Sequence, residues 1–177
     1  MTPSDWLASG DVLSHQGHRI FFRVAGQGAP LVLIHGFPTS SWDWHTVWPA
    51  LAGQYRLIAI DLLGFGASDK PVDFAYSIAA QAGVVEAVLA QLGVREAAVL
   101  AHDYGDTVAQ ELLARQIDGV SAWRLTRVVF LNGGLFPEAH RPRLIQRLLA
   151  SPLGGLVARL TSYARFAATM RQICARP

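Results

Sequence analysis

The chain has 177 residues, of which 51% are hydrophobic and 16% are charged, so its composition predicts one globular domain with a buried core and excludes a disordered chain. The sequence holds no apolar run long enough to cross a bilayer and no secretory signal pattern, and its single cysteine excludes an internal disulfide and a multi-cysteine zinc site. The formal net charge is only +2, but all thirteen acidic residues lie within residues 1–140, whereas residues 141–177 carry seven arginines and no acid.

Short apolar runs alternate with segments of helical periodicity along the chain. The strands that we expect cover residues 12–15, 18–24, 31–34, 57–60, 97–100 and 128–131, and the helices cover residues 40–51, 77–92, 106–116, 141–150 and 153–175. A turn at Gln16 and Gly17 joins the first two strands. The second strand presents Ile20, Phe22 and Val24 on one apolar face. Strands that alternate with helices predict an α/β fold with a mostly parallel sheet flanked by helices.

An abrupt change from strand to helix surrounds Asp103. An apolar strand precedes it, a helical pattern follows it, and the small residues Ala101 and Gly105 lie two positions away on either side. A nucleophile held in a strained turn needs such small neighbours, because strand and helix approach each other closely there. The spacing predicts the nucleophile elbow of an α/β-hydrolase with an aspartate in place of serine, whose carboxylate attacks saturated carbon and forms an ester. The alternative is that Asp103 only caps the following helix.

A second loop follows the third predicted strand. In an α/β-hydrolase this loop and the residue after the nucleophile supply the two backbone N–H groups of the oxyanion hole, which here belong to Phe37 and Tyr104. His35 and Gly36 are expected to be structural, with the histidine packed under the loop. His102 is expected to point away from the nucleophile, because adjacent strand residues face opposite sides.

Other polar and aromatic positions receive structural interpretations. The glycine-rich turn at residues 64–66 lacks the pattern of a phosphate-binding loop, and the polar side chains around it are expected to form hydrogen bonds within the turn. Trp42, Trp44 and Trp48 are expected in the core or in a pocket wall. Asp106 is expected to interact with the start of its helix. No metal site and no cofactor are expected.

Four longer motifs carry a family resemblance. They are HGFPTSSWDW at residues 35–44, DLLGFGASDKP at residues 61–71, HDYGD at residues 102–106 and NGGLFPE at residues 132–138. Together they resemble the epoxide-hydrolase and haloalkane-dehalogenase branch of the α/β-hydrolases, and they are most similar to its mesoderm-specific-transcript-like subgroup. The resemblance implies a small-molecule substrate, a covalent ester on the aspartate of the elbow, and a late histidine that activates water to hydrolyse this ester.

Several positions depart from the pattern of this branch. Its dehalogenases bind halide with an asparagine and a tryptophan at the places where this chain has Phe37 and Tyr104, which disfavours the haloalkane class, although the tyrosine hydroxyl is a donor. Some relatives place a second carboxylate where this chain has Asn132. Epoxide hydrolases protonate the opening ring with tyrosines of the cap, and Tyr163 is the only tyrosine in the C-terminal stretch, where no such role is assigned to it.

The largest departure from the family is an absence. In this fold the nucleophile is followed by an acid and then by the base histidine, and the last histidine here, His140, comes too early for that place. We expect residues 1–134 to form the N-terminal part of a hydrolase core and residues 135–177 to begin a helical cap that is incomplete. The chain alone is then expected to be inactive in turnover and at most alkylated once on Asp103.

Two other classes of function stay open. The first is that the chain is a non-catalytic truncated fragment. The second is that it is a basic amphipathic module that binds membranes through residues 141–177. Nucleic acid is not an expected partner, because the arginines are interspersed with apolar residues in a way that suits an amphipathic helix better. A sheet that ends after its sixth strand is expected to leave an unpaired edge. The expected location is the cytoplasm.

Overall fold

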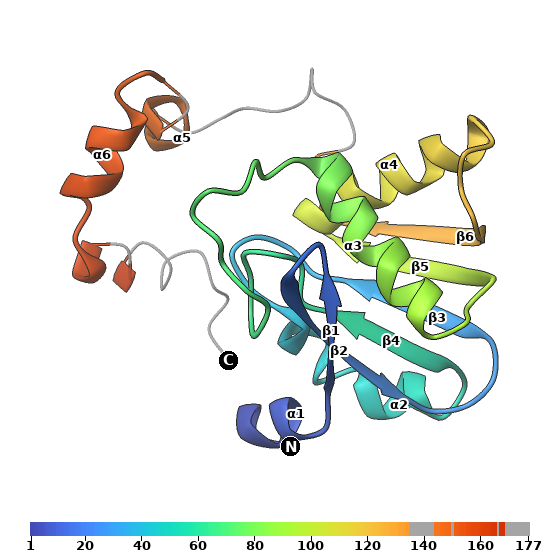
Figure 1. The fold of residues 1–177 in the computed structure, drawn as a ribbon. Coiled ribbons are helices and arrows are strands. Elements are labelled where there is room, and N and C mark those ends of the chain that lie inside the picture. The colour runs from blue at the N-terminus through green and yellow to red at the C-terminus, as the bar shows by residue number, and fades with distance from the viewer. Residues whose placement is uncertain (135–143, 150, 166, 169–177) are drawn as a thin grey trace. The chain divides into compact units, whose positions relative to one another are not determined.

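The computed structural model describes residues 1–134, 144–149, 151–165 and 167–168, and the chain divides into two compact units, Met1–Leu135 and Phe136–Pro177. The first unit holds a six-stranded sheet and its helices (Figure 1). The strands are β1 (Asp11–His15), β2 (His18–Ala25), β3 (Pro30–Ile34), β4 (Arg56–Ile60), β5 (Glu96–His102) and β6 (Arg124–Leu131). The helices are α1 (Pro3–Ala8), the 3-10 helix η1 (Ser41–Trp44), α2 (Trp48–Ala52), α3 (Ile78–Gln91) and α4 (Tyr104–Ile117).

The sheet has the strand order β1-β2-β4-β3-β5-β6. Strands β4, β3, β5 and β6 run parallel to one another, whereas β2 pairs antiparallel with both β1 and β4. The predicted α/β fold with a mostly parallel sheet is confirmed. In the pairing of β3 with β5, Ile34 lies opposite Ala101. The carboxyl ends of these two strands therefore meet at the same edge of the sheet, and the two loops that follow them are neighbours.

Both faces of the sheet are buried, whereas the sequence indicated a single apolar face for the second strand. Helices α3 and α4 cover one face, and α1, η1 and α2 cover the other (Figure 1). Ile20 packs in the first layer and Phe21 in the second. Arg23 places its guanidinium over the rings of Trp6 and Trp48, 4.3 and 4.8 Å from their centroids, so a polar residue in the strand pattern is also buried.

Helix α1 is absent from the elements predicted from the sequence. A capping box starts it: Thr2 Oγ1 accepts a hydrogen bond from Asp5 N at 3.2 Å, and Asp5 Oδ2 accepts one from Thr2 N at 2.8 Å. Pro3 lies at the first position of the helix, where its missing N–H costs nothing. The helix buries Trp6, whose Nε1 donates to Ser41 Oγ at 3.1 Å, and this side chain covers the face of the sheet that the strand pattern left unexplained.

The single helix predicted over residues 40–51 is wrong, because the structure has η1 and α2 with a break between them. Ser40 starts η1 by accepting a hydrogen bond from Trp42 N at 3.3 Å. Pro49 lies in the first turn of α2, and a proline is tolerated there because it has no N–H to donate to a preceding turn. The proline therefore forces the helix to begin again. Helix α2 ends at Ala52, one residue beyond the predicted end, and Gly53 is its C-cap.

The described part of the second unit contains α5 (Leu144–Leu149) and α6 (Gly154–Leu160). The helix predicted over residues 153–175 is wrong in its length, because Thr161 adopts φ −81° and ψ 106° and ends α6. Ser162 Oγ then accepts a hydrogen bond from Arg165 N at 3.3 Å and starts another turn. The outer ends of both helices predicted in this region, residues 141–143 and 169–175, lie outside the described residues.

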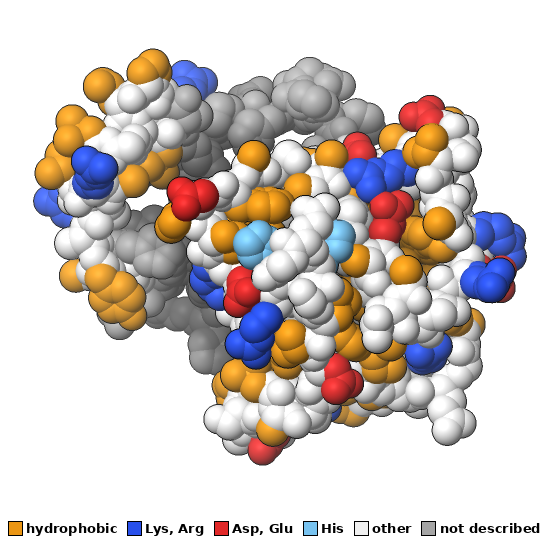
Figure 2. Space-filling view, in the orientation of Figure 1, with side chains coloured by type: hydrophobic (Ala, Val, Ile, Leu, Met, Phe, Trp, Pro, Cys, Tyr) orange, Lys and Arg blue, Asp and Glu red, His pale blue; other side chains and the backbone are white. Residues whose placement is uncertain are grey.

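The described surface of the second unit is basic and apolar. Figure 2 shows blue basic side chains beside orange hydrophobic ones on this unit. Leu144 and Leu160 are exposed, and residues 141–177 contain no acid. The assignment of residues 135–177 to a helical cap and the alternative of a membrane-binding module both stay predictions. No helix within the described residues is long and apolar enough to cross a membrane.

Candidate functional site

Asp103 lies in a sharp turn between β5 and α4. Its φ of +53° lies in a region that residues other than glycine rarely adopt, so the backbone is strained there. Ala101, two residues before it, is fully buried beside β3. A Cβ atom on Gly105, two residues after it, would lie 2.5 Å from the carbonyl oxygen of Ile34 and 2.7 Å from that of His35. The small neighbours thus allow the start of α4 to approach the end of β3.

The carboxylate of Asp103 is held by two backbone N–H groups. Its Oδ1 accepts hydrogen bonds from Phe37 N at 2.9 Å and from Tyr104 N at 2.6 Å, while no described residue donates to its Oδ2. An ordinary capping side chain accepts from the second or third residue of its helix, whereas this one bonds the first residue and a loop 66 positions away in sequence. The arrangement fixes one oxygen of the carboxylate and leaves the other available, which suits attack on an electrophilic carbon.

His35 is fully buried beneath this loop and both of its ring nitrogens are engaged. Nδ1 donates to the carbonyl oxygen of Gly36 at 2.8 Å, and Nε2 accepts from Leu62 N at 3.1 Å. These two bonds describe a neutral imidazole, and burial holds the pKa of His35 below its ordinary value of 6.5. The side chain has no nitrogen left to accept a proton from water, so its contacts are those of a structural residue.

The burial of His35 leads to a prediction about stability and pH. In the folded chain this histidine stays neutral, whereas in the unfolded chain it takes up a proton as the pH falls below about 6.5. Stability is therefore complete above this pH and is lost as the pH falls towards the lower pKa of the folded state. We expect the free energy of unfolding to fall by up to about 1.4 kcal/mol per pH unit in this window. Urea titrations between pH 8 and pH 5 measure it; His35→Gln should flatten the curve, and an equal slope in this variant contradicts the prediction.

Gly36 separates two side chains at the elbow. A Cβ atom at this position would lie 2.7 Å from Asp103 Cβ and 2.9 Å from His102 Nδ1. The loop after β3 can come close enough for Phe37 N to reach the carboxylate only because residue 36 has no side chain. No histidine among the described residues is hydrogen bonded to Asp103, and His140 lies outside them.

Aromatic rings surround the loop that binds the carboxylate. The ring of Phe65 lies 5.2 Å from that of His35, 6.2 Å from that of Phe37 and 5.8 Å from that of Tyr104. Phe37 is 64% exposed, so this aromatic surface reaches solvent at the residue whose N–H binds the carboxylate of Asp103. Burial raises the pKa of Tyr104, which keeps its hydroxyl protonated. The surroundings suit a substrate with an apolar or aromatic group.

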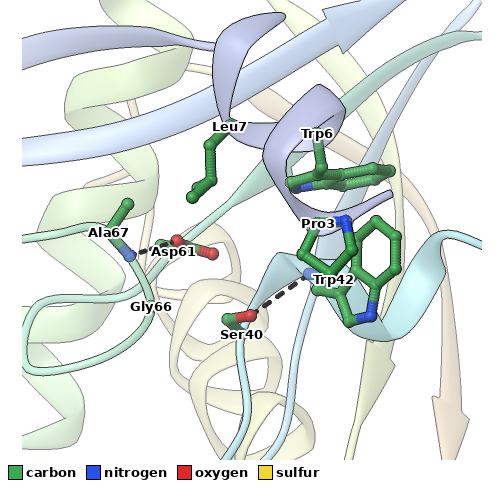
Figure 3. Close-up of a pocket in the computed structure, with 8 residues that line it drawn as sticks. All are labelled: Pro3, Trp6, Leu7, Ser40, Trp42, Asp61, Gly66 and Ala67. Carbon is green, nitrogen blue, oxygen red and sulfur yellow. Dashed lines mark hydrogen bonds between the residues drawn. The ribbon is translucent and has the colours of Figure 1, made fainter. Parts of the chain in front are cut away.

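A separate cavity of about 300 Å³ lies between α1 and the loop that follows β4 (Figure 3). Trp6 and Trp42 line it, and Asp61 lies at its inner side, while Asp103 is not among its lining residues. The carboxylate of Asp61 is satisfied by the backbone, because its two oxygens accept from Ser41 N and Ala67 N, each at 2.7 Å. These bonds give Asp61 a structural place in the loop, and Trp42 lies in a pocket wall, as the sequence indicated.

A family profile and named relatives match this chain. Residues 29–155 match the profile of the alpha/beta hydrolase fold family. The mesoderm-specific transcript homolog protein of Bos taurus is 49% identical over 162 residues, which cover 86% of this chain and 48% of that protein. The soluble epoxide hydrolase of a Corynebacterium species is 40% identical over 105 residues, which cover 57% of this chain and 36% of that protein.

A solved structure shows the same arrangement of elements. The haloalkane dehalogenase DatA of Agrobacterium tumefaciens superimposes with a TM-score of 0.70 at 31% identity, over 84% of this chain and 50% of that protein. The chain thus spans about half the length of the Bos taurus protein and of DatA. The resemblance inferred from the four motifs is confirmed.

Proposed function

This chain belongs to the alpha/beta hydrolase fold family, and we propose that Asp103 is its nucleophile and that its substrate is an epoxide or a haloalkane. The observation that carries the proposal is the carboxylate of Asp103, whose Oδ1 accepts two backbone hydrogen bonds while no described residue donates to its Oδ2. Relatives named as an epoxide hydrolase and a haloalkane dehalogenase support this reaction class, because both reactions break a bond between carbon and an electronegative leaving atom.

The first step forms one bond and breaks another. A lone pair on Oδ2 of Asp103 attacks a ring carbon of the epoxide, the ring carbon–oxygen bond breaks, and its electron pair stays on the departing oxygen, which takes a proton from water. With a haloalkane the electron pair leaves with the halide. The product in both cases is an alkyl ester of Asp103. A carboxylate attacks in this way without a general base, so the residues present at the elbow are sufficient for the step.

Hydrolysis of the ester has a further requirement. Water attacks the carbonyl carbon of the ester, and negative charge develops on Oδ1, where the N–H groups of Phe37 and Tyr104 stabilise it. A base must take the proton of the attacking water, and no described histidine is bonded to Asp103. We therefore assign ester formation to these 177 residues and complete turnover to a protein of the length of the relatives.

The epoxide class is the preferred substrate. Phe37 offers no side-chain donor to a departing halide, whereas an opening epoxide needs only a proton for its oxygen. Tyr104 carries the one hydroxyl next to the nucleophile in sequence, and this hydroxyl can donate a hydrogen bond to the oxygen of the opening ring. The aromatic rings of Phe37 and Phe65 favour an apolar substituent on the substrate.

Intact-mass measurement tests the proposed function. The chain is incubated with an excess of styrene oxide, and we expect its mass to rise by one equivalent of the epoxide and then to stay constant, with no diol accumulating. The corresponding diol, which has no electrophilic carbon, is the control and should leave the mass unchanged. Repeated turnover to diol would contradict the assignment of this chain to ester formation alone.

A further inference from the structure

Asp106 is a fully buried carboxylate in the first turn of α4, three residues after Asp103. Its Oδ1 accepts a hydrogen bond from Leu131 N at 3.3 Å, and its Oδ2 has no partner among the described residues. The sequence suggested that this side chain interacts with the start of its own helix. In the structure it instead accepts a hydrogen bond from the end of β6. A buried carboxyl oxygen without a partner is costly, so this residue calls for a physical explanation.

Leu131 connects Asp106 to the nucleophile. Its N–H donates to the carboxyl of Asp106, and its carbonyl oxygen accepts from Asp103 N at 3.0 Å. Asp106 N in turn donates to the carbonyl oxygen of Asp103 at 3.0 Å. Both backbone groups of Asp103 are therefore tied, directly or through one residue, to Asp106. These bonds act on a residue whose φ of +53° is strained and which needs such restraint to keep that conformation.

The segment after β6 lies directly against the carboxyl of Asp106. Asn132 has a φ of +57°, a second strained position beside the elbow. A Cβ atom on Gly133 would lie 1.9 Å from Asp106 Oδ2, whereas a Cβ atom on Gly134 would meet nothing within 4 Å. Burial raises the pKa of Asp106, and the hydrogen bond from Leu131 N opposes that rise. The turn at residues 131–133 is thus built around this one side chain.

We propose that Asp106 is a positioning residue for the nucleophile: its carboxyl fixes the turn at residues 131–133, and this turn fixes the backbone of Asp103 so that Oδ1 meets both N–H groups and Oδ2 faces the substrate. The inference rests on the proposed function of Asp103. Misplacement of a reacting group by about 1 Å can slow a reaction by about 100-fold, so loss of this restraint should appear in the rate of ester formation and not in the binding of the epoxide.

The positioning role is tested by saturation kinetics of capture, meaning formation of the ester between the chain and styrene oxide. In Asp106→Ala we expect the maximal capture rate constant to fall by about 100-fold while the epoxide concentration at half-maximal rate stays unchanged. Asp106→Asn keeps an oxygen that accepts from Leu131 N, so it should restore the rate to within about threefold of the parent chain. An Asn variant as slow as the Ala variant, or an Ala variant that captures as fast as the parent, overturns the proposal.

Two glycines provide a second test in which Asp106 itself is kept. Gly133→Ala pushes a methyl group against Oδ2 and should slow capture, while the matched variant Gly134→Ala has open space and should leave it unchanged. Equal capture rates in these two variants contradict the positioning role of Asp106. This test remains valid if Asp106→Ala does not fold.

Amide hydrogen exchange separates this inference from the proposed function. The amide of Asp103 should exchange at least about tenfold faster in Asp106→Ala and in Gly133→Ala than in Gly134→Ala, whereas Asp106→Asn should exchange at the rate of the parent chain. If the parent chain forms no ester, the proposed function of Asp103 fails, and exchange at Asp103 still decides whether Asp106 holds the elbow. An exchange rate at Asp103 that is the same in Gly133→Ala and Gly134→Ala overturns the positioning role by itself.

Discussion

Replacing Asp103 by asparagine should abolish covalent capture of an aryl epoxide. The amide keeps the size of the carboxylate and an oxygen that accepts from Phe37 N and Tyr104 N, but it lacks the negatively charged oxygen that attacks carbon. Removal of a nucleophile typically costs on the order of 10⁴-fold or more in rate. Capture followed by intact mass should therefore fall below detection in Asp103→Asn.

The control for this result is another aspartate. Asp73 is exposed and lies in the loop before α3, away from the described contacts of the elbow. Asp73→Asn removes one carboxylate from the chain and should leave the capture rate unchanged. Equal loss of capture in both variants would indicate non-specific labelling of surface carboxylates, and undiminished capture in Asp103→Asn would contradict the assigned nucleophile.

Gly105→Ala should destabilise the fold and slow capture together. The added Cβ would lie 2.5 Å from the carbonyl oxygen of Ile34 at the end of β3 and 2.7 Å from that of the buried His35, and buried backbone atoms have little room to move. Overpacking of this kind typically costs about 1–3 kcal/mol of unfolding free energy. The start of α4 has to shift away from β3, which carries Tyr104 N away from the carboxylate of Asp103. Urea denaturation measures the first effect and the capture rate measures the second.

Gly83 in α3 is the matched control for Gly105. It also lies inside a helix, but a Cβ atom there would approach only His15 Nε2, at 4.0 Å. Gly83→Ala should stabilise the chain by up to about 1 kcal/mol through its better helix propensity and should leave capture unchanged. If Gly105→Ala is as stable as Gly83→Ala, the close approach of α4 to β3 does not determine the geometry of the elbow.

The local part of the site could be predicted from the sequence. The elbow depends on residues within two positions of Asp103, and the amino-acid sequence alone shows that Ala101 and Gly105 are small. The contact between Asp103 and Phe37 N spans 66 positions, yet it follows from the adjacency of two strand ends once the order of parallel strands is known. Predicting that these two loops meet required only the order of the strands and not the positions of individual side chains.

Other features depend on contacts that no local pattern announces. The bond from Leu131 N to Asp106 forms because β6 ends beside the first turn of α4, a matter of register in three dimensions. Trp6 and Arg23 likewise pair only after α1 covers the second face of the sheet. The break at Pro49 was different, since proline inside a predicted helix is itself a local signal for a new helix start.

The measurement that tests the central claim most directly is peptide-level mapping of the ester. The chain is treated with styrene oxide, digested under mildly acidic conditions that preserve esters, and sequenced by tandem mass spectrometry. Asp103 as the one residue that carries the added mass is the predicted result. An adduct on any other residue, or a chain that stays unmodified while it remains folded, would contradict the account.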